Sequence, residues 1–375
     1  MPRTGRLFYA AILALVALLP AAAAAHPATG IVVDAQGRIH FSDLETVWRL
    51  DAGGRLAVFR PAVRGRHVHE LSIDGGGNVC GGDVTYEASI GKWIEAVWRR
   101  TPDGREETYL VAPTADPPRG VSVWRDAAGN TYYAEQDRHA NRETLLLKRT
   151  PRGVLTTLAG GAYGHADGRG TAARFRSIGG LTFGPDGSIY LTDAGDVRRV
   201  STDGEVRTLA KGLEGLFPED TQTGYGGLMG LAVDAGGNVY SSDYGRRRVL
   251  KVAADGKVSR AARAEAPWSP TGVAVSKDGR VFVLEVGFAP PNVSSGPRVR
   301  ELLPDGRSKV LATVGLRENA AARLTSSCDA GAAPDSADEC QNNVERALSL
   351  YFGLGVVAIG AVAGLRGFAR RTGHA

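Results

Sequence analysis

Histidines and carboxylates that could bind a metal ion are found in three segments of the chain. The candidate metal ligands are His67, His69, His139 and His165. Neutral imidazole binds Zn²⁺, and Glu70 or Asp167 would add a carboxylate ligand or a general base. The competing interpretation is four solvated loop histidines, because the "HVH" spacing is short and nothing in the sequence fixes the other distances. Zinc is the cofactor that these residues suggest, with calcium as the alternative.

Three further residues are candidates for contacting a ligand. They are Arg119, Tyr225 and Trp268. Arg119 also joins Glu70 and Asp167 as a candidate catalytic residue. Each of the three ligand candidates could equally pack between structural units. Beyond residue 25 the sequence has no G-x-S-x-G motif, so it gives no signal for a serine hydrolase.

The elements that must position these side chains come from one repeated pattern. An apolar strand, a glycine-containing turn and a second strand that ends in an acid occur six times, as in "GLAVDAGGNVYSSD" at 230–243. The acids are Asp43, Asp83, Glu135, Asp193, Asp243 and Glu285. Each copy continues with a third strand, a second glycine-containing turn and a fourth strand. Four short antiparallel strands about every 40 to 60 residues predict an all-β, six-bladed β-propeller.

The strand directions place the variable connections on one side of this predicted ring. We define the top as the face where the first strand of each blade begins. The connections between second and third strands, and between blades, then lie on top, and the four candidate histidines map there. The last blade has four strands of its own. We therefore expect the ring to close by side-chain packing between the first and last blades.

The repeated acids favour a structural role. An acid at the same place in every blade serves something that every blade needs, and we expect it to accept hydrogen bonds from the backbone of the following turn. A ligand without sixfold symmetry requires a site that breaks the symmetry of the repeats, as the histidines do. His40 and Cys80 stand inside strands and are expected to be structural.

The repeat resembles that of the NHL family, in the unit "GLAVDAGGNVYSSDYGRRRV" at 230–249. The segment 158–175, "LAGGAYGHADGRGTAARF", is similar to the linker common between such repeats in exported bacterial proteins. The resemblance covers about residues 30–315 and implies a six-bladed, TolB-like propeller. Related propellers include regucalcin-like gluconolactonases and a zinc-dependent peptide lyase, and the fold does not choose among them.

The comparison with gluconolactonases fails at the residues that would hold calcium. The resemblance implies Glu, Asn and Asp side chains near the start of the first strands, around the channel. The corresponding positions here carry Thr29, His69, Arg119, Gly179, Met229 and Thr271. Glu70 is the only nearby acid, whereas Ca²⁺ requires several oxygen ligands. The match to the zinc lyase is limited to His69 at one such position.

Both ends of the chain differ from the repeats. Arg3 and Arg6 precede an apolar run and "AAAAAH", which predicts a secretory signal peptide over 1–25 rather than an uncleaved anchor. Residues 347–365 are uncharged and are followed by arginines. This pattern predicts a transmembrane helix with a basic cytoplasmic tail at 366–375. A buried core helix and a removable sorting signal are the alternatives for this segment.

The repeats, the two terminal segments and the net charge together predict the domain organisation and the function. The propeller occupies 26–316 and a polar linker occupies 317–346, where Cys328 and Cys340 predict a disulfide in an oxidising compartment. The net charge of +5 is modest and the basic residues are scattered, so no nucleic-acid partner is expected. We predict an exported, membrane-anchored binding or scaffolding module for a protein or small-molecule ligand on its top face. A metal-dependent hydrolase or lyase at the top mouth of the channel is the alternative.

Overall fold

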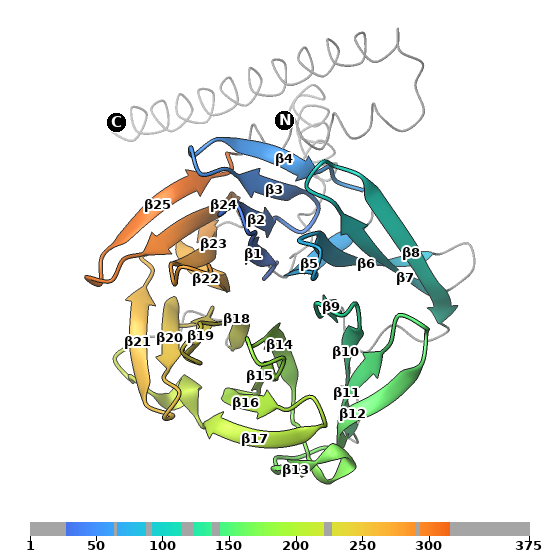
Figure 1. Cartoon of the computed structure of the whole chain (residues 1–375). Coiled ribbons are helices and arrows are strands. Elements are labelled where there is room, and N and C mark those ends of the chain that lie inside the picture. Colours follow the sequence, from blue (N-terminus) through green and yellow to red (C-terminus); the bar gives the residue numbers. More distant parts are fainter. Residues whose placement is uncertain are drawn as a thin grey trace, which may run out of the picture.

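Six sheets radiate from a central axis in the computed structural model of the chain (Figure 1). The structure describes residues 28–63, 66–87, 92–114, 123–136, 143–220, 227–289 and 293–315. Within each sheet the strands are antiparallel neighbours, with the first strand nearest the axis and the fourth toward the outside. The predicted six-bladed β-propeller with four-stranded antiparallel blades is confirmed.

The blades take their strands in chain order. Blade 1 contains β1 (Ile31–Val33), β2 (Ile39–Ser42), β3 (Val47–Leu50) and β4 (Leu56–Arg60), and blade 2 contains β5 (His67–Ile73), β6 (Val79–Glu87), β7 (Lys92–Arg100) and β8 (Glu106–Thr114). Blade 3 contains β9 (Val123–Arg125), β10 (Thr131–Gln136), β11 (Glu143–Arg149) and β12 (Leu155–Ala162), and blade 4 contains β14 (Ile178–Phe183), β15 (Ile189–Asp193), β16 (Asp196–Val200) and β17 (Glu205–Ala210). Blade 5 contains β18 (Leu228–Val233), β19 (Val239–Asp243), β20 (Arg248–Val252) and β21 (Val258–Arg263), and blade 6 contains β22 (Trp268–Val275), β23 (Val281–Ala289), β24 (Val293–Leu302) and β25 (Ser308–Thr313).

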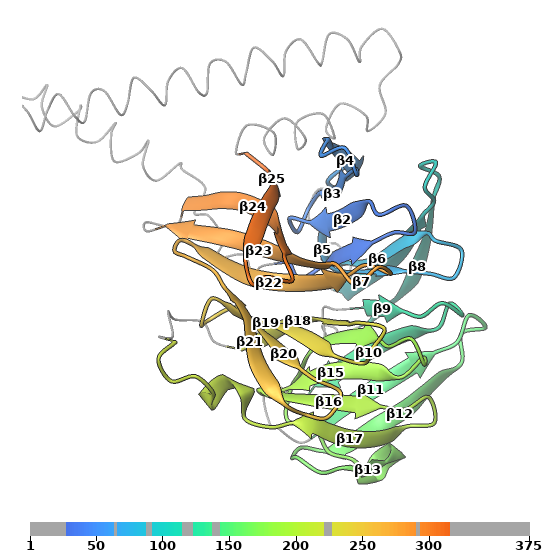
Figure 2. The ribbon, with the colours of Figure 1, turned by 60° about the vertical axis from the view of Figure 1, so that its left-hand side comes forward.

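The connections before and after blade 4 contain the short elements outside this plan. Strand β13 (Gly168–Arg169) pairs with the outer edge of β17 and makes blade 4 a five-stranded sheet (Figures 1 and 2). One-turn 3₁₀ helices follow at η1 (Gly170–Ala172) and η2 (Leu213–Gly215). The sequence predicted four strands in this blade. The fifth arises because the linker between blades 3 and 4 folds back along an exposed strand edge.

A turn aspartate closes the first hairpin of several blades. In blade 5, Asp234 Oδ1 accepts hydrogen bonds from the backbone N–H groups of Gly236 and Asn238, each at 2.9 Å. Gly237 has φ +78°, a conformation that a residue with a side chain rarely adopts. Asp34 and its turn use the same arrangement in blade 1. The "DxxG" turns of the sequence therefore fix the register of the first two strands.

His40 and Cys80 have the structural roles that their strand positions predicted. His40 is buried, and its Nε2 lies 3.0 Å from Asp34 Oδ2. In blade 3 the equivalent residue is Tyr132, which donates its hydroxyl hydrogen to Asp126 at 2.9 Å. Burial lowers the pKa of His40, which keeps the ring neutral. Burial raises the pKa of the Cys80 thiol to about 12, so this cysteine is an inert core residue.

The ring closes between blades 1 and 6 by side-chain packing, as the sequence predicted. Phe41 and Trp48 of blade 1 belong to one buried cluster with Phe282, Leu284 and Val299 of blade 6. The described strands of these two blades form separate sheets, with no strand of one blade completing the other. Apolar burial, which contributes about 25 cal/mol per Å² removed from water, therefore holds the closure together.

Several predictions concern parts of the chain outside the described residues. These are the signal peptide at 1–25, the linker at 317–346 with Cys328 and Cys340, the apolar segment at 347–365, the basic tail at 366–375, and the site candidates Arg119, His139 and Tyr225. Across the described ranges, no helix is both long enough and apolar enough to cross a membrane.

Candidate functional site

A cavity of about 240 Å³ follows the axis of the propeller between the six inner strands. Successive blades contribute the apolar residues Ile31, Leu71, Trp124, Leu181, Leu231 and Val273, although polar atoms make up the larger part of the exposed wall. Two of the residues that line it are charged. Arg125 stands at the bottom end of β9 and its guanidinium lies against the turn at Gly129. Glu70 stands at the top end of β5, where the channel opens toward the variable loops.

The inner strands carry an irregularity at this top end. In blades 2, 4, 5 and 6 the pairing between the first and second strands shifts register there. In blade 2 the shift lies between Val68 and Leu71, so His69 and Glu70 leave the ladder. A β-bulge of this kind re-aims side chains and is common beside functional sites.

Glycine fills the position equivalent to Glu70 in blades 1, 4, 5 and 6. The equivalent residues, by strand register, are Gly30, Gly180, Gly230 and Gly272. A Cβ atom added at any of the four would lie 2.0 to 2.9 Å from the backbone of the next blade. Such an approach is possible only without a side chain. Blade 2 therefore departs from the packing rule of the ring and places a carboxylate at the channel mouth instead.

Glu70 is held from blade 1. The hydroxyl of Thr29 donates a hydrogen bond to Glu70 Oε1. The backbone N–H groups of Thr29 and Gly30 both donate to the carbonyl oxygen of His69, at 3.1 and 2.8 Å. The Glu70 residue is 8 % exposed. The carboxylate is therefore largely buried, and the neighbouring blade fixes its position.

His67 and His69 lie close to each other on β5, the strand that also carries Glu70. Their ring centroids are 6.1 Å apart and the ring planes are inclined by 70°. The residue between them is pinned to blade 1, because Val68 N–H donates to Leu44 O at 2.6 Å. Ser42 also donates its hydroxyl hydrogen to the carbonyl oxygen of Val68 at 2.8 Å. The two imidazoles thus stand on a rigid strand end rather than on a loop.

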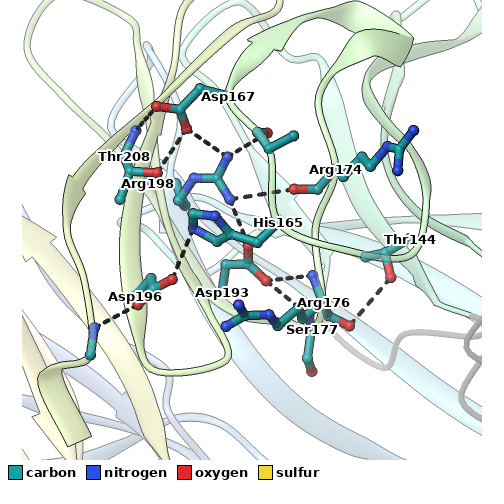
Figure 3. A network of polar contacts seen from close by, with 12 residues as sticks. Thr144, His165, Asp167, Arg174, Arg176, Ser177, Asp193, Asp196, Arg198 and Thr208 are labelled. Carbon is teal, nitrogen blue, oxygen red and sulfur yellow. Dashed lines mark hydrogen bonds and ion pairs between the residues drawn. The ribbon is translucent and has the colours of Figure 1, made fainter. Parts of the chain in front are cut away.

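His165 is engaged elsewhere, in the linker between blades 3 and 4 (Figure 3). Its Nε2 lies 2.9 Å from Asp196 Oδ2 at the start of β16. The other oxygen of Asp196 accepts a hydrogen bond from the Gly212 N–H at 2.7 Å. His165 therefore contacts a residue that also holds the linker between blades 4 and 5.

Asp167 belongs to the same linker and contacts blade 4. It accepts hydrogen bonds from the backbone N–H and the hydroxyl of Thr208 at 3.1 and 2.7 Å, and from Arg198 Nη2 at 2.9 Å. Burial opposes ionisation, but the bonds from Thr208 and the Arg198 charge outweigh it and lower the pKa of Asp167. This carboxylate holds β17 and the linker together, and a lowered pKa makes it a weak base.

Arg198 is the centre of this network (Figure 3). The residue is fully buried, and its Nη1 donates to Asp193 Oδ2 at 2.7 Å. Its Nη2 donates to the carbonyl oxygen of Ala166 at 2.8 Å, and its guanidinium stacks over Phe175. One buried cation thus joins the third strand of blade 4 to the preceding linker. Truncating such a group leaves its partner charge buried and uncompensated.

Arg248 repeats the arrangement in blade 5. It is fully buried, and it donates to Asp243 at 2.8 Å and to Asp220 at 3.1 Å. It also donates to backbone carbonyl oxygens of the preceding linker, including Leu216 O at 2.6 Å. Although burial opposes ionisation, hydrogen bonds from Arg248 and Arg260 lower the pKa of Asp220. Two linkers on the top face are therefore fixed by arginines that the sequence analysis did not single out.

The acids that end the second strands confirm their predicted structural role only in part. Asp43 accepts a hydrogen bond from the Thr46 N–H of the following turn at 2.7 Å, as expected. Asp193 instead accepts from the Arg176 and Ser177 N–H groups of the preceding linker, at 2.7 and 2.9 Å. The expectation of a purely local turn was incomplete, because it ignored linkers that pass over the ends of the strands.

The remaining site candidates are more dispersed. Trp268, at the start of β22, packs against Arg298, whose guanidinium carbon lies 4.0 Å from the ring centroid. It does not line the cavity. In the part of the chain that the structure describes, no three His, Cys, Asp or Glu side chains gather as a metal site requires. His139 lies outside that part.

Arg119, the ligand-contact candidate expected before β9, lies outside the described residues.

No family model matches the chain. A stretch of 113 residues is 30% identical to Teneurin-m of Drosophila melanogaster, which covers 29% of this chain and 4% of that protein. The chain thus spans a small fraction of this relative's length.

Solved structures with a similar arrangement include virginiamycin B lyase of Staphylococcus aureus, at 13% identity over 75% of this chain and 83% of that one, with a TM-score of 0.45. A gluconolactonase of Xanthomonas campestris matches at 15% identity over 68% and 83%, with a TM-score of 0.47. The calcium-binding protein regucalcin of Agrobacterium tumefaciens matches at 20% identity over 69% and 81%, with a TM-score of 0.46. Identities this low concern the fold alone. The protein is a six-bladed β-propeller by its own strand pairing.

Glu70 was a candidate on sequence grounds, but the reason it stands out among the repeats lies in the packing between blades. The signal is visible when the repeats are aligned, because "ELSID" replaces a unit such as "GIVVD" or "GLAVD". The reason for the repeated glycine becomes clear only in the structure, where the backbone of the next blade leaves no room for a Cβ atom. The sequence thus contained the exception, and the structure shows the packing rule from which it departs.

Proposed function

We propose that the chain is an exported, membrane-tethered β-propeller that binds a protein or small-molecule ligand on its top face, at the channel mouth around Glu70. The observation that carries the proposal is the carboxylate at a position where the other described blades 1, 4, 5 and 6 have glycine. Glycine is the residue that close packing against the next blade selects at this position in those four blades. We therefore attribute the acid in blade 2 to a ligand rather than to packing.

The surroundings of Glu70 support a preformed site. Thr29 contacts the carboxylate from blade 1, and His67 and His69 stand on the same strand, which Val68 fixes to blade 1. Below it lies the axial cavity, whose wall combines apolar side chains from all six blades with exposed polar atoms. A concave site with a few fixed polar groups is the common form of a small-ligand site. The anchored linkers around Arg198 and Arg248 make this face rigid, which lowers the entropy lost on binding.

A thermal-unfolding screen tests binding at Glu70. The full chain, purified in detergent micelles, is melted with a panel of free amino acids, dipeptides, monosaccharides and sugar lactones. A ligand present at 100 times its Kd stabilises the folded state by about 2.7 kcal/mol, which raises Tm by several degrees. We expect compounds that raise the Tm of the wild type to lose their effect in Glu70→Gln and Glu70→Gly.

The matched control is Glu265→Gln, which removes an exposed carboxylate near the start of β22. This variant should keep every shift seen in the wild type. Compounds that stabilise the wild type and Glu70→Gly equally would place binding elsewhere and contradict the proposal.

The predicted signal peptide and the apolar segment at 347–365 support export and tethering. An epitope inserted between Lys277 and Asp278, in an exposed turn below the ring, reports location without touching the channel mouth. We expect the tagged chain in the membrane fraction, accessible to protease from outside. Deleting 346–375 should release it in soluble form. A cytoplasmic or soluble full chain would refute this part.

A second candidate function is a metal-dependent hydrolase or lyase at the same mouth. The nearby rings of His67 and His69 favour it, since imidazole is a metal ligand and Glu70 on the same strand could act as a general base. The described residues do not themselves bring three ligands together, so this function needs a further ligand. Hydrolysis of a sugar lactone that EDTA abolishes, Zn²⁺ restores and Glu70→Gln removes would establish this activity. Metal-independent binding with no turnover would favour the binding module.

A further inference from the structure

We propose that the ligand at the channel mouth is a free dipeptide whose carboxylate end enters the axial cavity and accepts a hydrogen bond from the indole N–H of Trp124. The inference rests on the proposed function, because the amino end of the same dipeptide would contact Glu70. It adds the chemical class of the ligand and a second residue that recognises it. Four observations on the described residues support it.

The first observation is a buried donor without a partner. Trp124 of β9 is 2 % exposed and lines the cavity. Its indole N–H has no hydrogen-bond partner among the described residues. By contrast, the buried Trp48 and Trp98 donate theirs to Asp43 and Asp83, at 2.8 and 3.1 Å. A buried donor without a partner is costly, so one that belongs to a cavity wall points to an acceptor inside the cavity.

The second observation is the layer of the cavity that contains Trp124. The strand register puts this residue level with one residue from each other inner strand, namely Val32, Ser72, Thr182, Ala232 and Ala274. Hydroxyl groups come from β5 and β14, the inner strands on either side of β9, and the other three blades supply aliphatic side chains (Figure 1). Polar side chains of this layer therefore gather in blades 2, 3 and 4, and Glu70 stands above them on β5.

The third observation is the backbone of the inner strands. Each inner strand lies at the edge of its sheet and pairs with a second strand on one side only. Its other edge, with a row of N–H and C=O groups, faces the axis. These groups explain why polar atoms make up the larger part of the exposed wall although most lining residues are apolar. An extended peptide can hydrogen-bond to such an edge through its own main chain.

The fourth observation is the size and charge of the cavity. A cavity of about 150 Å³ holds benzene, so about 240 Å³ holds roughly ten non-hydrogen atoms. Among the described residues, the charged ones that line it are Glu70 at the top and Arg125 toward the bottom. A linear zwitterion with its amine above and its carboxylate below matches this order of charges.

The spacing of the groups favours a dipeptide over other zwitterions. Glu70 precedes Ser72, the residue of the Trp124 layer on β5, by two positions, which is a rise of about 7 Å. An extended dipeptide separates its amine from its carboxylate by a similar distance, because its backbone advances as a strand does. A single α-amino acid carries both groups on one carbon atom and is too short to reach both levels.

The experiment titrates the full chain in detergent micelles with alanylglycine, a dipeptide of the size that the cavity accepts. N-acetyl-alanylglycine, which lacks the amine, alanylglycine amide, which lacks the carboxylate, and free alanine are titrated in parallel. Calorimetry measures each Kd. We expect alanylglycine to bind at least about 10-fold more tightly than the other three, since each of them loses one charged contact. Equal affinity for all four compounds would overturn the inference without the use of any variant.

Trp124→Phe tests the indole N–H, because it removes the donor and keeps an aromatic ring in the buried cluster between blades 3 and 4. We expect it to bind alanylglycine about 10- to 100-fold more weakly, the loss for one hydrogen bond to a charged group. The matched control is Trp48→Phe, which removes an indole that contacts Asp43 and does not line the cavity. This control should keep the affinity of the wild type.

Nuclear magnetic resonance of isotope-labelled indole groups gives a direct readout. The N–H signal that is absent from Trp124→Phe should shift when alanylglycine is added to the wild type. A signal that stays unchanged while the dipeptide binds would show that water satisfies this N–H, and it would overturn the role of Trp124.

The outcomes separate this inference from the proposed function. If a monosaccharide or a lactone gives the stabilisation that depends on Glu70 and alanylglycine does not bind, the dipeptide inference is wrong and binding at the channel mouth stands. If alanylglycine binds equally to the wild type, Trp124→Phe and Glu70→Gln, its site lies elsewhere and both proposals are wrong. Weaker binding in both variants supports both.

Discussion

Two junctions between neighbouring blades use the same residue types for different purposes. At the junction of blades 3 and 4, His165, Asp167 and Arg198 contact groups in blade 4 and its linkers (Figure 3). At the junction of blades 1 and 2, His69 and Glu70 stand at a bulge on the channel mouth. The first set fastens a linker to a blade. In the second set, Glu70 occupies a position where blades 1, 4, 5 and 6 have glycine.

The comparison teaches how to separate structural from functional charge in a repeat protein. The arrangement around Arg198 recurs around Arg248 in blade 5, so it answers a need that both blades share. The arrangement around Glu70 is not repeated in blades 1, 4, 5 and 6. A residue that blade 2 has and these four blades lack is better explained by a ligand than by the folding of a blade. The two junctions should therefore respond to mutation in opposite ways.

The largest effect is expected for Arg198→Met. The substitution keeps much of the side-chain volume but leaves Asp193 buried without its cation, which should cost about 3–5 kcal/mol of unfolding free energy. The control is Arg199→Met on the same strand, because Arg199 pairs with the exposed Asp186 and should cost less than about 1 kcal/mol. Urea unfolding followed by circular dichroism measures both. Equal losses of unfolding free energy in the two variants would show that the buried contacts of Arg198 do not stabilise the attachment of the linker to blade 4.

The next effect contrasts Gly180→Ala with Glu70→Gly at equivalent positions. The Cβ of Gly180→Ala would lie 2.0 Å from Met229 O, and the overpacking should cost about 1–3 kcal/mol. Glu70→Gly restores the glycine that the repeat uses here and should change stability by less than about 1 kcal/mol while it abolishes ligand binding. Gly215→Ala, with open space around it, is the control. If Glu70→Gly unfolds the protein, Glu70 has a structural role, and the proposed difference between the two blade junctions is wrong.

The smallest effect concerns pH and Asp220. Contacts with arginines hold its pKa below the ordinary 3.8, so its stabilising contribution is present above that pH and is lost as pH falls through the folded-state value. Asp220→Asn should therefore cost about 1.5 kcal/mol at pH 7 and progressively less below pH 4. Guanidinium titrations at both pH values measure the difference. A cost that is the same at pH 7 and pH 3 would mean that the charge of Asp220 contributes nothing.

Much of the architecture could be predicted because it is local and repeated. Alternating strands, "DxxG" turns and their spacing gave six blades and their strand order, since turn chemistry and side-chain alternation act over a few residues. The closure between blades 1 and 6 also followed, from a count of strands in the last blade. The pairing of β13 with β17 did not, because a strand of two residues has no periodicity of its own.

Less of the candidate site could be predicted. The sequence named His67, His69 and Glu70 and placed them on top. It treated His165 and Asp167 as their equals, whereas these two contact Asp196 and Arg198. Nothing in the local sequence reports that a linker histidine faces an aspartate 31 residues later. The buried arginines were missed for the same reason.

The amino-acid sequence by itself determined the number of blades, the face on which the variable loops gather and the identity of the residue at each repeat position. Those features depend on short-range geometry and on counting. Only the tertiary structure decided which polar groups hold linkers and which one stands in the channel. Whether a side chain fits at the inner strand depends on how closely the next blade approaches, and that distance is set by contacts between segments far apart in the chain.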